Sequence, residues 1–380
     1  MSVLFTTRPT WTEINLENLA FNFQSVKTFI GNTVEYMAVV KADAYGHGSV
    51  ACAKKLEAEN IDWLGVALPE EGLELRESGI QTPILCLGSF WNGQEHLLLA
   101  NNITPVIYRK ESAENFNRAA ANKSVKAKIH IKIDTGMGRI GVRFDKVKEF
   151  VETLKSLKNL SLEGLMTHFA VADNLSENNF TDIQIKRFYE AVRIFEENGF
   201  HSKYKDLANS PGAIAHEKSR GNMVRLGGVL YGLGGDVLPK EIIKPELKPV
   251  MSLHTRIAHV KNVPKGETIG YGRTFLTKRD SIIATVPIGY QDGYRRSLSN
   301  RGRVIVKGFL APVIGRISMD WTIIDITEIH GVKVNDEVIL IGEQNGLTVT
   351  AEELAAKIET ISYEITCGIN RRVTRKYVGS

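Results

Sequence analysis

The segment with the clearest chemical potential contains Lys41, which directly follows apolar residues in Ala38-Val-Val-Lys-Ala-Asp-Ala-Tyr-Gly-His-Gly48. A lysine flanked by apolar residues is partly desolvated, which disfavours the ammonium form and leaves a nucleophilic amine. Such an amine can form an imine with a carbonyl compound. Tyr45 and the two glycines after it would suit a phosphate, through a hydroxyl and a close backbone approach. A solvated lysine followed by an ordinary turn is the alternative.

Two arginines and a tyrosine stand in glycine-containing segments farther along. Arg225 precedes Leu-Gly-Gly, and phosphate sites recur in glycine-rich loops after late barrel strands. Arg139 follows Gly-Met-Gly, and Tyr271 lies between two glycines. His168 follows an apolar run. Taken singly, each also fits a salt bridge, a turn or a structural role.

The elements that would position these residues alternate between short apolar runs and longer amphipathic ones. Strands are expected near residues 34–40, 62–67, 83–87, 104–108, 127–133, 162–167, 204–208 and 223–230. Helical patterns cover residues 15–30, 48–60, 68–78, 92–101, 111–122, 145–157, 178–198 and 211–217. Eight such units predict an α/β fold, a (β/α)8 barrel, in which strand ends line the catalytic face. A doubly wound open sheet is the competing arrangement.

The pattern changes after Gly235. Residues 236–249 carry three prolines and many charges, as a linker would. Closely spaced strands then follow near residues 250–262, 281–287, 303–307, 311–316, 321–326 and 337–341, with one clear helix at 351–358. We therefore predict a barrel over residues 1–240 and a mostly-β domain over 241–380, with residues 1–10 able to pack against the second.

The segment around Lys41 resembles the cofactor-lysine motif of alanine racemases, and further blocks follow in the family's order. They span residues 8–15, 132–141, 164–170, 208–210, 224–225, 231–233, 270–272, 287–290, 315–320 and 371–373. The resemblance implies a homodimer with a shared active site that binds pyridoxal 5'-phosphate and interconverts L- and D-alanine. The D-alanine would serve peptidoglycan synthesis.

The resemblance also implies roles for individual residues. Lys41 would take the proton from D-alanine, and Tyr271 of the partner subunit would take it from L-alanine. Arg225 would donate to the pyridine nitrogen, and His168 would connect it to the tyrosine. Further cofactor contacts are expected from Tyr45, Arg139, Asn209, Ser210, Gly227, Gly228 and Tyr363. Substrate contacts are expected from Arg139, Tyr271, Met319, Asp320 and Tyr290.

Arginine at the pyridine nitrogen has a chemical consequence. Because arginine stays protonated, it should keep the ring nitrogen unprotonated, so a carbanion would be short-lived and quickly reprotonated. In several family members the lysine that matches Lys132 is carbamylated and positions the arginine that matches Arg139, and we carry that over as a hypothesis. The chain departs from the family's usual residues at Gly228, Pro211 and Thr374. Pro211 has no N–H to offer a phosphate.

Three other functions fit parts of the pattern. A decarboxylase of the same architecture would place an acid at the pyridine nitrogen, and a non-catalytic cofactor carrier would lack the second domain. A serine, lysine or broad-specificity racemase stays open.

Composition limits the partners and the cell compartment that we expect for this protein. The net charge of +5 is mild and spread along the chain, unlike that of a nucleic-acid groove. The three cysteines show no metal or disulfide spacing. We expect a cytoplasmic protein without metal, nucleic-acid or membrane partners, because no signal peptide or membrane span is evident.

Overall fold

The computed structural model describes residues 8–379, and its first unit is a closed barrel of eight parallel strands. The predicted (β/α)8 barrel is therefore confirmed, and the open sheet is excluded by the pairing of β5 with β6. The strands are β2 (Glu35–Val39), β3 (Trp63–Val66), β4 (Ile84–Cys86), β5 (Ile103–Ile107), β6 (Ala127–Asp134), β8 (Leu160–Met166), β9 (Tyr204–Ala208) and β10 (Met223–Leu226).

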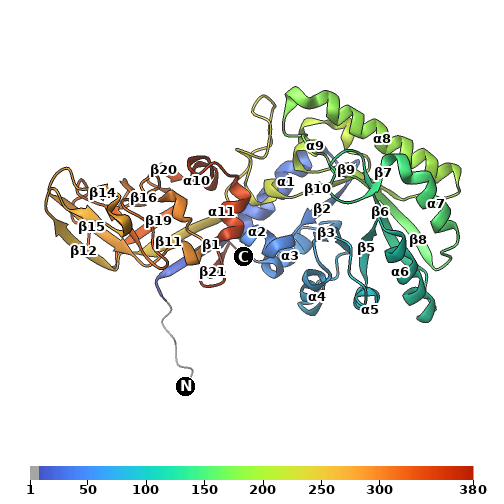
Figure 1. The fold of residues 1–380 in the computed structure, drawn as a ribbon, viewed down its shortest axis with the longest axis horizontal. Coiled ribbons are helices and arrows are strands. Elements are labelled where there is room, and N and C mark those ends of the chain that lie inside the picture. The colour runs from blue at the N-terminus through green and yellow to red at the C-terminus, as the bar shows by residue number, and fades with distance from the viewer. Residues whose placement is uncertain (1–7, 380) are drawn as a thin grey trace, which may run out of the picture.

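Helices surround the barrel (Figure 1). They are α1 (Leu16–Ile30), α3 (Ser49–Ala58), α4 (Pro69–Glu77), α5 (Glu95–Ala100), α6 (Lys110–Asn122), α7 (Val147–Lys155), α8 (Asn178–Glu197) and α9 (Ser210–Ala215). Each buries one stripe against the strands; α7, for example, buries Val147, Phe150, Val151 and Leu154. The connections include α2 (Lys41–Gly46), β7 (Val142–Arg143), η1 (Phe144–Lys146), η2 (Leu175–Glu177), η3 (Glu217–Ser219) and η4 (Gly228–Tyr231).

The barrel interior is layered, and strand periodicity explains how polar residues reach its mouth. A lower layer consists of Met37, Trp63, Leu85, Val106, Met166, Tyr204 and Met223. Successive side chains of a strand alternate between faces, so residues two positions on point the same way. Asp206 follows Tyr204 and Arg225 follows Met223 at that interval, and both are buried. The sequence therefore places a charged layer directly above the apolar one.

The second unit is mostly strands, as predicted. Its main sheet contains β1 (Thr10–Asn15), β11 (Met251–Arg256), β16 (Arg303–Val306), β17 (Phe309–Pro312), β19 (Glu337–Gln344), β20 (Leu347–Val349) and β21 (Thr374–Val378). The smaller sheets contain β12 (His259–Val263), β15 (Ser281–Val286), β18 (Thr322–Asp325), β13 (Thr268–Ile269) and β14 (Phe275–Leu276). The remaining elements are η5 (Tyr271–Arg273), η6 (Tyr290–Asp292), η7 (Arg296–Leu298), α10 (Ala351–Lys357) and α11 (Ser362–Gly368).

Three details differ from the sequence-based expectation. The run 250–262 divides at Ile257 into β11 and β12, which belong to different sheets. A second helix, α11, follows α10, although only one helix was expected in this half. The first described strand, β1, belongs to the second unit, where it pairs with β11 and β21, and the barrel strands follow it in the sequence. Residues 1–7 lie outside the described residues, so their expected packing stays a prediction.

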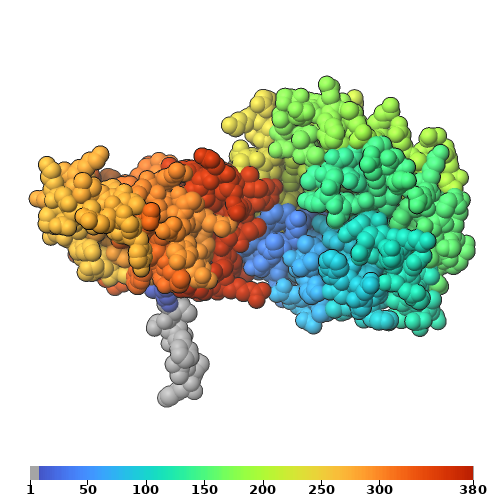
Figure 2. Space-filling model, viewed as in Figure 1, coloured from blue at the N-terminus to red at the C-terminus, as the bar shows by residue number. Residues whose placement is uncertain are grey.

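The two units form two lobes joined at α11 and β21 (Figures 1 and 2). The barrel's last strand ends at Leu226, and residues 239–250 contain no regular strand. We propose the boundary near residue 240, with β1 as the exception. No helix within the described residues is long and apolar enough to cross a membrane.

Candidate functional site

Lys41 lies at the start of α2, directly after β2, and the backbone that follows it is left-handed. Ala42, Asp43, Ala44 and Tyr45 have φ between 52° and 54° and ψ between 36° and 51°. A left-handed helical conformation costs L-residues roughly 1–2 kcal/mol each. Four in succession persist only where surrounding contacts impose them. The position of Lys41 is therefore set by its neighbours.

Contacts from both units hold this turn. Glu71 of α4 accepts a hydrogen bond from Ala42 N at 2.7 Å, and Asp43 Oδ1 accepts one from Ser49 N at 2.9 Å. Arg375, in β21 of the second unit, donates to Gly46 O from Nε and NH2 at 3.2 and 3.1 Å. These bonds satisfy backbone groups at helix ends, which have no partner within the helix.

Three basic side chains, those of Lys132, Arg139 and Arg225, gather around Lys41 at the mouth of the barrel. Burial and the charge of Arg139 lower the pKa of Lys41. Burial, together with Arg225 and Arg139, lowers the pKa of Lys132 to about 7. Lys132 is 5% exposed. Near neutral pH the mouth can thus offer a free amine at Lys132, and its arginines give it a positive field for an anionic ligand.

Arg225 is fixed by acceptors on β9 and in the segment directly after β8. Its NH1 pairs with Asp206 Oδ1, and its NH2 donates to Thr167 O at 2.8 Å and contacts His168 Nδ1 at 3.2 Å. Within residues 8–379 its Nε makes no hydrogen bond, so this donor is free for a ligand. Burial and the charge of Arg225 lower the pKa of His168 well below its ordinary value, so the imidazole is neutral.

Hydroxyls and glycines form a cradle beside the cations. Gly227 N donates to Ser210 Oγ at 2.9 Å. A Cβ atom on Gly227 would lie 2.8 Å from the Tyr45 hydroxyl, and one on Gly228 would lie 2.6 Å from the Tyr363 hydroxyl. Asn209 accepts from Gly212 N at 3.1 Å and caps α9. Hydroxyl groups and bare backbone at such close quarters are suited to phosphate oxygens.

Four predicted residues lie elsewhere in this chain. Tyr271 lies between β13 and β14, at the end of the second unit remote from the barrel (Figure 1). It is 70% exposed, and Met319 is 51% exposed. Tyr290 also projects from this unit, and Asp320 pairs with Arg372 at 2.7 Å. A single chain therefore brings these residues to no common point with Lys41.

Sequence reasoning missed three residues that act on the site. Asp206 is the buried partner of Arg225, Glu71 holds the turn, and Cys367 of α11 lies near enough to influence the pKa of Lys41. Asp206 had a usable signal: it is a lone acid in an otherwise buried strand end, two positions after Tyr204. Glu71 and Cys367 had none, because their proximity depends on tertiary packing.

Comparison with known proteins matches both units to one family. The family model described as "Alanine racemase, N-terminal domain" matches residues 14–234, and "Alanine racemase, C-terminal domain" matches residues 250–377. An alanine racemase of Halothermothrix orenii is 47% identical over 372 residues, covering 98% of this chain and 97% of its own.

Two solved structures are similar over almost their full length. The Bacillus anthracis alanine racemase with bound L-Ala-P is 37% identical, with a TM-score of 0.92, and covers 98% of this chain and 96% of its own. The Bartonella henselae alanine racemase with covalently bound pyridoxal phosphate is 27% identical, with a TM-score of 0.88, and covers 97% and 99%. The similarity extends across both lobes.

Proposed function

The chain belongs to the alanine racemase family, which interconverts L- and D-alanine, and we propose that its barrel mouth performs this reaction on pyridoxal 5'-phosphate bound through Lys41. The family depends on this cofactor. When bound, it withdraws electrons from the substrate and makes the α-proton removable. The observation that carries the proposal is an amine of lowered pKa on an imposed turn, beside a cluster of cationic side chains and a cradle of hydroxyls and bare glycines.

The cradle supports phosphate binding. Ser210, Tyr45 and Tyr363 each bring a hydroxyl to Gly227 and Gly228, where any side chain would fill the space. The cations at the mouth add electrostatic attraction for a dianion. Asn209 acts by capping the helix that begins at Ser210. Arg139 would contact the phenolic oxygen of the cofactor and complete the expected set.

Arg225 would orient the pyridine ring of the cofactor and limit how strongly that ring withdraws electrons. Its unpaired Nε can donate to an unprotonated pyridine nitrogen, while NH1 and NH2 stay paired with protein oxygens and His168. An arginine is a poor source of a proton, so little negative charge is stored in the ring. A proton removed from the substrate is then returned quickly, which favours racemisation over transamination.

Racemisation needs a base on each face of the substrate, and of the two expected bases this chain places Lys41 at its own barrel mouth and Tyr271 elsewhere. We assign Lys41 Nζ to the proton of D-alanine and Tyr271 of the partner subunit to that of L-alanine. Met319 and Asp320 of the partner subunit would receive the substrate carboxylate, and Tyr290 of the partner subunit would narrow the entrance. The exposure of Tyr271 and Met319 within one chain supports a homodimer with shared sites.

Lys132 is suited to reversible carbamylation. Only an unprotonated amine reacts with carbon dioxide, and a pKa of about 7 leaves a large fraction in that form at neutral pH. The carbamate would be an anion among Arg139 and Arg225 and would hold Arg139 in place. Intact mass under bicarbonate should show the mass of one added carbon dioxide, and its loss in Lys132→Met would locate it.

We place this reaction in the cytosol, as a supply of D-alanine for peptidoglycan. Alanine is the preferred substrate in this proposal, because Tyr363 of this chain, together with Tyr290 of the partner subunit, would restrict the space for larger side chains.

The defining experiment is turnover by the cofactor-loaded protein. It should absorb at about 420 nm, the usual band of the lysine-bound cofactor, and convert L-alanine to D-alanine. Lys41→Ala should lose both properties, whereas Lys148→Ala, on the exposed face of α7, should keep both. Parallel assays with serine and lysine test the breadth of specificity. A protein that binds the cofactor but equilibrates no amino acid would contradict the proposal.

A further inference from the structure

Four charged side chains form a continuous ion-pair network in the second unit. Arg8 makes two bonds to Asp292, from NH1 to Oδ2 at 3.0 Å and from NH2 to Oδ1 at 2.6 Å. Arg372 lies between the two aspartates of the network. Its Nε is 3.4 Å from Asp292 Oδ1, and its NH2 donates to Asp320 Oδ1 at 2.7 Å. The proposed reaction gives Arg8, Asp292 and Arg372 no role.

The centre of this network is buried. Asp292 is fully buried, and a buried carboxylate needs both a counter-charge and hydrogen bonds. The paired bonds from Arg8 also fix the orientation of the carboxylate, because the guanidinium fork is planar. Gly289 N donates a further bond to Asp292 Oδ2 at 3.0 Å. The network therefore holds the short helix η6, which ends at Asp292, in one position.

The helix η6 in turn holds the loop that contains Met319. Tyr290 N donates to Ser318 O at 3.0 Å, and Gln291 N donates to Met319 O at 3.1 Å. A side chain at Gly289 would collide with both carbonyls, so the two segments approach closely. Met319 N–H has no hydrogen-bond partner among the described residues. The bonds from η6 thus fix the carbonyl side of this loop and leave a backbone donor free for a ligand.

Arg372 also offsets a charge that would oppose substrate binding. Asp320 directly follows Met319, so its carboxylate lies close to the donor proposed for the substrate carboxylate. Two negative charges at short range repel each other. The bond from Arg372 NH2 turns Asp320 into one half of an ion pair. Without Arg372, the substrate carboxylate would meet the uncompensated charge of Asp320.

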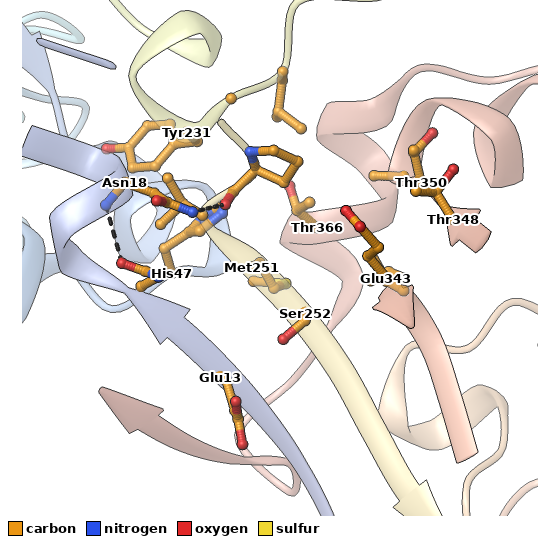
Figure 3. A pocket seen from close by; sticks show the side chains of 18 of the residues that line it. Glu13, Asn18, His47, Tyr231, Met251, Ser252, Glu343, Thr348, Thr350 and Thr366 are labelled. Atoms are coloured by element: carbon orange, nitrogen blue, oxygen red, sulfur yellow. Dashed lines mark hydrogen bonds between the residues drawn. The ribbon is translucent and has the colours of Figure 1, made fainter. Parts of the chain in front are cut away.

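The network lies apart from the cavity between the two units. That cavity has a volume of about 290 Å³, and Figure 3 shows Ser252, Glu343 and Thr350 among the side chains that line it. Its lining contains none of the four network residues. The network instead contacts η6 and Asp320, which directs its effect to the loop around Met319.

We propose that Arg372 and Asp292 are positioning residues for substrate binding in the active site of the other subunit. The inference rests on the proposed function, in which Met319 of the partner subunit receives the carboxylate of a substrate that lies at Lys41. Asp292 holds the loop through η6, and Arg372 offsets the charge of Asp320. The substrate carboxylate keeps its charge throughout the reaction, so this contact stabilises the ground state and the transition state alike. Its loss should therefore raise KM and leave kcat unchanged.

Steady-state kinetics of the cofactor-loaded enzyme test the assignment. Arg372→Gln should raise the KM for alanine by about fivefold or more and change kcat by less than about twofold. Arg372→Lys keeps a positive charge near Asp320 and should raise KM by less. Arg193→Gln breaks an exposed arginine–glutamate pair on α8 and is the matched control, with unchanged KM. A KM for Arg372→Gln within about twofold of the wild-type value, or a loss confined to kcat, would overturn the proposal.

Mixed dimers show in which active site Arg372 acts. A dimer of one Lys41→Ala chain and one Tyr271→Phe chain has one intact site, and the loop serving that site comes from the Lys41→Ala chain. The parent dimers are inactive, so all turnover comes from the mixed dimer. Arg372→Gln should raise KM by about fivefold or more on the Lys41→Ala chain and leave KM unchanged on the Tyr271→Phe chain. Equal KM values in the two mixed dimers would overturn the proposal, whereas no turnover in the mixed dimer that keeps Arg372 would refute the shared site itself.

Discussion

Replacing Asp206 by asparagine should destabilise the barrel strongly, because it would leave Arg225 as an uncompensated buried charge. Arg225 is 3% exposed and Asp206 is fully buried, and the two side chains pair directly. Removing one partner of a buried ion pair costs about 3–5 kcal/mol. Asparagine keeps an oxygen acceptor, so we expect the lower end, about 3 kcal/mol. At about 2–4 °C per kcal/mol, the melting temperature should fall by about 6–12 °C.

Thermal melting of the cofactor-loaded enzyme measures this effect. Asp182→Asn, on the exposed side of α8, is the control and should melt with the wild type. Adding Arg225→Gln to Asp206→Asn removes both charges, so the double variant should lose less stability than the sum of the single variants. A fall of less than about 2 °C for Asp206→Asn, or additive single losses, would refute the role given to the pair.

Three further predictions concern the site and the turn. Gly228→Ala should reduce cofactor affinity by at least about tenfold, measured by cofactor titration, because the new Cβ would lie 2.6 Å from the Tyr363 hydroxyl. The pKa of Lys132 is about 7 in the folded chain and 10.5 in the unfolded chain, so the unfolded chain binds more protons between these pH values. The free energy of unfolding should therefore rise with pH over this range. In buffer free of carbon dioxide, Lys132→Met should make the melting temperature depend less on pH there. His47 has a pKa of about 4 folded against 6.5 unfolded, so unfolding free energy should fall by about 3 kcal/mol as the pH drops through this interval, and denaturation of His47→Gln should lack this loss.

The sequence predicted the barrel well because its signals are local. Most of the eight strands are short and largely apolar, and helices such as α7 have a one-sided apolar stripe. Short segments carry less information about their secondary structure. The helix α11, Ser-Tyr-Glu-Ile-Thr-Cys-Gly, has no strong propensity and was missed, although it carries Tyr363.

The site was predictable in its residue types and less so in its geometry. The left-handed turn after Lys41 contains Ala-Asp-Ala-Tyr, which has no local preference for positive φ. Contacts with Glu71 and Arg375 impose it, and those depend on the assembled fold. Likewise, Asp206 is recognisable as a lone acid in a buried strand, but its pairing with Arg225 depends on how β9 packs against β10.

The central claim is that each active site combines Lys41 of one subunit with Tyr271 of the partner subunit, and mixed dimers test it most directly. Lys41→Ala and Tyr271→Phe should each abolish alanine racemisation. When the two variants are unfolded together and refolded at equal concentrations, about half of the dimers should be mixed, each with one intact site, and turnover should recover to about a quarter of the wild-type value. Failure to recover any turnover while dimers form would contradict the shared site.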